Sequence, residues 1–267
     1  MDDHIKEFYS QYSDESPKGN YYKAIALHET ADIDWETISQ KVPILPKGWY
    51  ELAQLPAKDR IQFTYDYWLS KLPYHPSIDE LLSNFFGALD NIGIFLIEKK
   101  YGDPFEVEMV YSLLNNRGFY RATTPATDDD IIRLQKLFQE YILPEDYLAF
   151  LQIHDGFCKT IDCTGITSSK NMKTSYNDFQ DLLESQNPVT TKSGRLVDPH
   201  TLIPFYESFG MPYYQCFWAE WYPDQEMGNV YYSVADNTIS DPLKKPDAMA
   251  FPTFIDCLLF YLEQIET

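Results

Sequence analysis

The chain has 267 residues and is strongly acidic, with 41 Asp and Glu against 21 Lys and Arg and a formal net charge of −20. Nonspecific nucleic-acid binding depends on Lys and Arg that neutralise phosphates, so this charge argues against nucleic acid and favours a basic protein as the partner. Hydrophobic residues make up 44% and aromatic residues 16% of the sequence, which excludes a disordered acidic chain and predicts a folded core.

The amino terminus and the cysteines favour a soluble protein of the cytoplasm. Residues 1–7 are acidic and lack the basic and apolar regions of a signal peptide. No run of about 18 apolar residues is present, so we expect no membrane contact. Without a secretory signal, the four cysteines are expected to be reduced thiols: Cys158, Cys163, Cys216 and Cys257.

The first part of the chain predicts helices after an irregular start. The first ~30 residues are Tyr-rich, are interrupted by Ser16-Pro17-Lys18-Gly19-Asn20 and show no sustained period. A helix is predicted between Pro56 and Pro73, because apolar residues recur there at helical spacing: Ile61, Tyr65, Trp68, Leu69 and Leu72. Ser77 and Glu80 have the spacing of a capping box, which predicts a second helix whose apolar stripe is Ile78, Leu82, Phe85 and Leu89.

The period then changes from helical to alternating, which predicts strands. Residues 94–100 are rich in strand formers and end at a Gly-Asp-Pro turn, after which residues 105–113 alternate apolar and polar side chains. This pattern indicates a hairpin. A second turn at 115–118 leads to a third strand at 119–121, so residues 1–122 are expected to form an amino-terminal extension of helices plus a β-meander, of unknown role.

A domain boundary is expected at residues 123–126, and residues 127–267 read as a separate α+β domain. Thr127 and three following aspartates predict a helix start, with Ile131, Leu134, Phe138 and Tyr141 on the buried side. Pro144 begins a short helix that ends before Asp155-Gly156. Further elements are predicted at 202–205, 215–218 and 229–233 as strands, near 176–184 as a helix, and from Thr253 onward as a helix capped with Asp256.

The order of these elements and one motif resemble a known family. The motif is Leu143-Pro144-Glu145-Asp146-Tyr147-Leu148-Ala149-Phe150-Leu151 followed by Asp155-Gly156-Phe157. Downstream come Leu202-Ile203-Pro204-Phe205, then Cys216-Phe217-Trp218, then Gly228-Asn229-Val230-Tyr231-Tyr232 and the last helix. This succession resembles the SUKH superfamily of cell-wall assembly regulators and bacterial toxin-immunity proteins, over roughly residues 127–265.

The resemblance implies an α+β fold in which a SUKH-like antiparallel sheet packs with helices. It also implies a non-enzymatic module that binds another protein, possible roles being an immunity protein that neutralises a toxin domain or an intracellular regulator or scaffold. The family usually has Asn-Gly where this chain has Asp155-Gly156. Asp tolerates the same turn, so the difference affects any role of the Asn amide rather than the fold.

Catalytic and metal-binding patterns are weak. His154, Cys158 and Cys163 lie close in sequence, but their spacing is not that of a zinc site, so no metal or other cofactor is expected. Cys158 or Cys216 could pair with His154 or His200 in a Cys/His hydrolase, which is the third functional hypothesis. The favoured interpretation of Cys216 is a buried thiol, because aromatic residues surround it.

The most distinctive surface candidate is the stretch from residue 218 to residue 224. Its aromatic residues can anchor a partner and its acids can select a basic surface, so we predict partner contacts by Trp218, Glu220, Trp221 and Asp224. Strand alternation would bury Trp218, so at least one of the two tryptophans is expected to be structural.

Overall fold

A computed structural model gives the fold, and it describes residues 1–10, 20–30, 33–160, 164–186, 188–208, 213–243 and 249–263. The chain divides into two compact units. Unit 1 comprises Met1–Lys71, Asp79–Thr124 and Lys159–Ile161, and unit 2 comprises Leu72–Ile78, Pro125–Cys158 and Asp162–Thr267. Each unit is described by itself. No helix in the described parts of the chain is long and apolar enough to cross a membrane.

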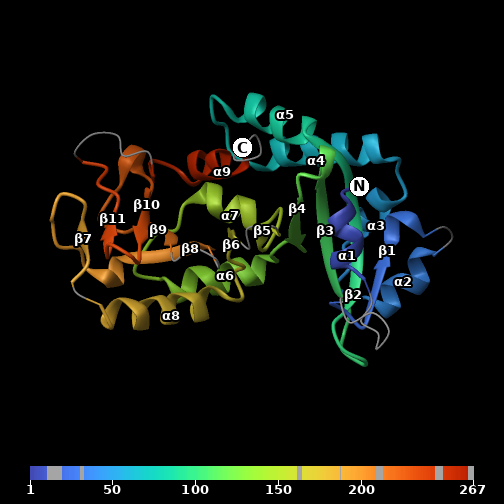
Figure 1. Ribbon diagram of the computed structural model, residues 1–267, viewed down its shortest axis with the longest axis horizontal. Helices are drawn as coiled ribbons and strands as arrows, with labels where there is room; N and C mark the ends of the chain where they lie inside the picture. Colours follow the sequence, from blue (N-terminus) through green and yellow to red (C-terminus); the bar gives the residue numbers. More distant parts are fainter. Residues whose placement is uncertain are drawn as a thin grey trace. The chain divides into compact units, whose positions relative to one another are not determined.

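Unit 1 is built on a four-stranded antiparallel sheet in the order β1-β2-β3-β4 (Figure 1). The strands are β1 (Lys23–Ala26), β2 (Leu89–Glu98), β3 (Glu106–Leu113) and β4 (Phe119–Thr123). The helices are α1 (Asp3–Phe8), α2 (Trp35–Lys41), α3 (Lys47–Ala53), α4 (Ala57–Lys71) and α5 (Ile78–Gly87). Short 3-10 turns occur at η1 (Leu27–Glu29) and η2 (Leu114–Asn116). The predicted helix after Pro56 and the predicted hairpin are therefore confirmed.

The expectation of an irregular amino terminus is wrong for the described residues 1–10 and 20–30, whereas most of the predicted break at residues 16–20 lies outside the described residues. Residues 3–8 form α1, and residues 23–26 form β1, which pairs with β2. Asp2 caps α1 by accepting a hydrogen bond from the backbone of His4, and its other oxygen accepts one from Gly118 at 2.7 Å. A helix of six residues is too short to show a period, and its stability comes from these tertiary contacts, so the sequence pattern could not reveal it.

Two details of the helices also differ from the sequence pattern. Trp68 of the predicted apolar stripe of α4 is buried, but the other buried residues of this helix are Arg60 and Thr64, whereas the predicted Ile61, Tyr65 and Leu69 are only half-buried. Arg60 is tolerated inside because its guanidinium donates to the carbonyl oxygen of Ile92 at 2.5 Å and to Asn91 Oδ1 at 2.7 Å. The predicted Ser77–Glu80 capping box is wrong, because the Ser77 N–H donates to Nδ1 of His75 instead.

Unit 2 contains a mostly antiparallel sheet in the order β6-β8-β9-β10-β11-β7, with β12 paired to β10 and the β11–β7 pair parallel. The strands are β5 (Phe157–Lys159), β6 (Thr164–Ile166), β7 (Thr190–Thr191), β8 (Leu202–Ser208), β9 (Tyr213–Trp218), β10 (Asn229–Ser233), β11 (Thr238–Ile239) and β12 (Ala250–Phe251). The helices are α6 (Asp128–Leu137), α7 (Glu145–Leu151), α8 (Met172–Glu184) and α9 (Phe254–Glu263). The predicted α+β class is confirmed.

Helices pack on both faces of this sheet, because side chains alternate along each strand (Figure 1). On one face, Phe179 of α8 packs against Tyr214 of β9 and Tyr232 of β10. On the other face, Tyr147 of α7 contacts Phe205, Phe217 and Phe254. The sheet is thus the middle layer of unit 2.

The helix starts of unit 2 follow the predicted capping chemistry. Thr127 and Asp130 form a reciprocal capping box at the start of α6. Thr253 and Asp256 bond in the same way before α9, through contacts of 3.1 Å in each direction. The first-turn acids also interact favourably with the positive end of each helix dipole.

Candidate partner-binding surface

The loop that joins β9 to β10, residues 219–228, carries most of the predicted partner-binding residues. It contains the 3-10 turn η4 (Pro223–Gln225) and is closed by three backbone hydrogen bonds. Trp218 donates to Gly228 at 3.0 Å, Gly228 donates to Trp221 at 3.0 Å, and Trp221 donates to Trp218 at 2.9 Å. These bonds hold the loop in one conformation, which lowers the entropy that binding would cost.

Trp218 itself is not available to a partner, because its side chain is completely buried in the core beneath α8. The expectation that one tryptophan is structural is therefore confirmed, and a direct partner contact by Trp218 is wrong for this structure. The Arg195 guanidinium lies over the Trp218 ring at 4.6 Å from its centroid, and Glu220 lies 4.0 Å from Arg195. Glu220 remains about 40% exposed, so it can still face a partner.

Trp221 is half-buried and packs against the same core cluster. Its ring lies on Gly228, where an added Cβ would come within 2.5 Å of the ring. Glycine is therefore required at this point to seat the indole. Tyr222 follows with 47% of its surface exposed. The side chain of the fourth predicted residue, Asp224, lies outside the described parts of the structure.

The segment between α6 and α7 extends this surface. Tyr141 donates a hydrogen bond to the carbonyl oxygen of His200 at 3.4 Å, and its pKa is raised by burial and by the neighbouring Glu140, Asp198 and Tyr222. Tyr141 therefore lies near Tyr222 of the β9–β10 loop. Sequence reasoning placed Tyr141 on the buried side of a helix, whereas it lies beyond the end of α6 and is half-buried.

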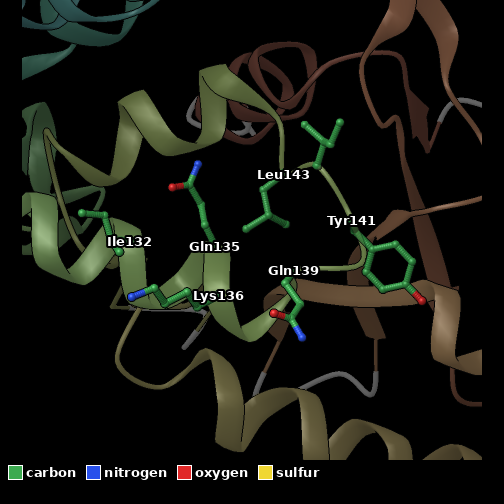
Figure 2. A pocket seen from close by; sticks show the side chains of 7 residues that line it. Ile132, Gln135, Lys136, Gln139, Tyr141 and Leu143 are labelled. Carbon is green, nitrogen blue, oxygen red and sulfur yellow. The ribbon is translucent and has the colours of Figure 1, made fainter.

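Tyr141 also lines an open hollow of about 430 Å3 beside α6, shown in Figure 2. Ile142 is 82% exposed at this hollow and Ile132 is 45% exposed. Exposed apolar side chains next to a tyrosine are typical of protein interfaces. The sequence does contain a signal for the exposure of Ile142. This residue lies in the helix-breaking segment before Pro144, where it cannot join the buried face of a helix. We call Tyr141, Ile142, Glu220, Trp221 and Tyr222 the acidic–aromatic surface.

One buried acid, Asp146, lies where α7 and α9 begin. Asp146 accepts hydrogen bonds from the backbone of Tyr147 at 2.8 Å and of Ile255 at 2.9 Å. Burial raises the pKa of Asp146 to about 6 despite these donors, and nearby Glu226 contributes to the increase. The pKa of Glu226 is also raised, by desolvation and by Glu145. Asp146 ties the start of α7 to the start of α9 and is a structural group.

Asp155, which stands where the family usually has Asn, stabilises the fold through hydrogen bonds. Its carboxylate accepts hydrogen bonds from the Ser169 N–H at 2.6 Å and the Ser169 hydroxyl at 2.8 Å. The side-chain carbonyl of an asparagine could accept a hydrogen bond in the same turn. Asp155 therefore keeps the acceptor role that the usual Asn would have. Gly156 follows with φ of 116°, a left-handed conformation that favours glycine.

The geometry of the described residues does not support a nucleophilic cysteine or a metal site. Cys216 is completely buried, and desolvation holds the pKa of its thiol well above the usual value, which disfavours a nucleophilic thiolate. His154 is buried beside Phe157, with 6.0 Å between the ring centroids, and Cys163 lies outside the described residues. Among the residues that the structure describes, no three His, Cys, Asp or Glu side chains converge as metal ligands would.

Residues 125–257 match the family described as SMI1 / KNR4 family (SUKH-1). No curated protein matches the chain significantly. The matched segment runs from α6 into α9 and contains the acidic–aromatic surface, whereas most of unit 1 lies outside it. Members of this family are known as immunity proteins or cell-wall regulators, and SUKH domains often act by binding protein partners.

Proposed function

We propose that residues 125–257 form a non-enzymatic protein-binding module that acts in the cytoplasm as an immunity protein and neutralises a toxin domain with a basic surface. The observation that carries this proposal is the SUKH-1 family match over these residues. The net charge of −20 supports a basic partner, because opposite charges speed association and complement each other in the complex.

The acidic–aromatic surface supports direct contact with such a partner. Tyr222 and Ile142 expose apolar area, Trp221 is fixed on a closed loop, and Glu220 supplies an exposed carboxylate. Interfaces of this kind obtain affinity from aromatic anchors and obtain association rate from charges near the rim. Asp224 belongs to the same loop and completes the proposed set of acids.

The alternative is an intracellular regulatory or scaffold protein of the cell-wall regulator type. Unit 1 favours this alternative, because it adds a sheet with its own buried cluster to a chain whose family match lies almost wholly within unit 2. In that case unit 1 would be the partner-specific part. A Cys/His hydrolase is the third hypothesis, and the burial of Cys216 argues against it.

A neutralisation assay tests the immunity proposal. The chain is produced together with toxin domains encoded beside its gene, and we expect one of them to lose its toxicity and to bind the purified chain in a 1:1 complex. If no adjacent toxin gene exists and the chain instead copurifies with cell-wall assembly components, the regulator hypothesis replaces the immunity proposal.

Charge-neutralising variants test the surface in that complex. We expect Glu220→Gln and Asp224→Asn to slow association severalfold at low salt and to flatten its salt dependence. Glu51→Gln is the matched control, because Glu51 is an exposed acid of unit 1 with 62% of its side chain accessible. Equal association rates for all three variants would place the interface elsewhere, and unit 1 would then be the first region to test.

A further inference from the structure

A second cleft of about 470 Å3 lies on the unit 2 sheet, on the face that carries α9. Its walls are mainly aromatic, with Tyr206, Tyr213, Tyr231 and Tyr261 together with two phenylalanines, and Gln215 and Lys192 supply polar groups. Clefts of this size hold small ligands or a single inserted side chain. Sequence reasoning missed it because its residues come from four strands (β8, β9, β10 and β12), from α9 and from segments between elements, and only the fold brings them together.

Three tyrosines form a continuous aromatic wall across neighbouring strands. Tyr206 of β8 and Tyr231 of β10 both pair with Gln215 of β9, one on each side. The Tyr213 ring lies 6.2 Å from that of Tyr206 at an interplanar angle of 18°, and 5.4 Å from that of Tyr231 at 36°. All three are half-buried, so their rings remain partly accessible.

The amide of Gln215 supplies a hydrogen-bond acceptor among these rings. Its Nε2 donates to Asn229 Oδ1 at 2.8 Å and to the Met249 carbonyl at 3.3 Å. The Asn229 amide is oriented in turn by its own bond to the Thr253 carbonyl at 2.9 Å, which fixes Oδ1 as the acceptor. Both amide hydrogens of Gln215 are therefore used within the fold, and Oε1 is the atom left for a ligand.

We propose that this cleft binds an arginine side chain of a protein partner, a step that rests on the proposed protein-binding function. A guanidinium group is planar, stacks on tyrosine rings and carries only donors, so it matches both the aromatic wall and the Gln215 acceptor. The acidic chain attracts a basic partner toward it. Lys192 also lines the cleft, and its positive charge disfavours a cation. Removing this charge should therefore strengthen the binding of a guanidinium.

The probe is N-acetyl-arginine methylamide, titrated into the full chain and followed by the chemical shifts of residues on β8, β9 and β10. Its neutral isostere, the citrulline derivative, is the control ligand. We expect the arginine probe to bind at least tenfold more tightly than the citrulline probe, because only the charged guanidinium makes cation–π interactions with the tyrosine rings. Equal binding of the two probes, or no binding of either, overturns the proposal.

Three variants test the geometry. Tyr231→Leu should weaken arginine binding about fivefold, whereas Tyr231→Phe should retain most of it because the ring face persists. Tyr101→Leu, at an 82% exposed tyrosine of unit 1, should have no effect. Thermal unfolding of each variant verifies that it is folded.

The exposed residue Lys192 gives a test that does not depend on altering the core. Lys192→Ala should strengthen binding of the arginine probe severalfold, because a like charge is removed. Weaker binding would show that the cleft prefers an anion, and the arginine proposal would fail. The probe assay is independent of the toxin assay, so an arginine-binding chain that neutralises no toxin refutes the proposed function alone.

Discussion

The buried carboxyl of Asp146 predicts an unusual pH dependence of stability. Its folded-state pKa of about 6 lies above the value of ~3.9 expected in the unfolded chain. Between these values the folded state binds more protons than the unfolded state, so stability is highest below about pH 4 and falls as the pH rises through 6. A difference of about 2 pH units at ~1.4 kcal/mol each corresponds to about 3 kcal/mol.

The variant Asp146→Asn isolates this effect. An amide cannot ionise, so the free energy of unfolding of the variant relative to the wild type should rise by about 3 kcal/mol between about pH 4 and pH 7. The amide NH2 replaces one of the two oxygens that accept from Tyr147 and Ile255, which adds a stability difference that does not depend on pH, so the test is the pH dependence of the difference. Urea unfolding at several pH values measures the difference.

Asp130 provides a matched control at another helix start. Although burial opposes ionisation, hydrogen bonds from Thr127 and the nearby Arg133 lower the pKa of Asp130 to about 2. Its contribution is thus complete above ~pH 4 and is lost only as the pH falls toward 2, so the Asp130→Asn difference should be flat from about pH 4.5 to pH 7. A flat curve for Asp146→Asn as well would refute the reasoning, because backbone donors and the α9 dipole would then offset desolvation.

Three further predictions concern the core, the thiols and the boundary. Trp218→Ala should destabilise unit 2 by about 3–5 kcal/mol in urea unfolding, whereas Trp221→Ala should leave it folded and mainly speed dissociation of the partner; a folded, fully stable Trp218→Ala would contradict the packing. Cys216 should alkylate more slowly than a free thiol at neutral pH, and rapid labelling or stoichiometric zinc would revive the enzyme or metal hypotheses. Limited proteolysis should cut within residues 123–126, and fragment 127–267 should unfold cooperatively; if it does not, the two units share one core.

Sequence patterns located the helices of unit 2 and its strands β8, β9 and β10, because each of these carries a strong local signal, but they missed the strands of two or three residues, namely β5, β6, β7, β11 and β12. The bounds of β10 coincide with the predicted strand, and the caps at Thr127 and Thr253 lie where the side chains indicated. The failures have a common physical cause. The short helix α1 and the buried face of α4 both depend on contacts distant in sequence, such as that of Arg60 with Ile92, and no local pattern reports such contacts.

The candidate site shows the same difference between features with a local sequence signal and features that depend on contacts distant in sequence. Alternation along β9 correctly buried Trp218, but it could not place Tyr222 near Tyr141, since these residues are brought together by the packing of separate segments. The aromatic cleft was hidden for the same reason. Tyr206, Gln215 and Tyr231 become neighbours only through the register of β8, β9 and β10.

The motif that carries the family resemblance holds the fold together rather than facing a partner. Asp146 bonds the start of α9, Tyr147 packs its ring against Phe217 and Phe254, and Asp155 binds the turn that leads into α8. Residues that satisfy buried donors and fill a core are constrained by the fold whatever the partner is. If the proposed binding function holds, we expect partner specificity at accessible positions such as Glu220, Tyr222 and the tyrosine cleft. We therefore expect exchange of the β9–β10 loop between two SUKH-1 domains to transfer partner choice while leaving the unfolding free energy nearly unchanged.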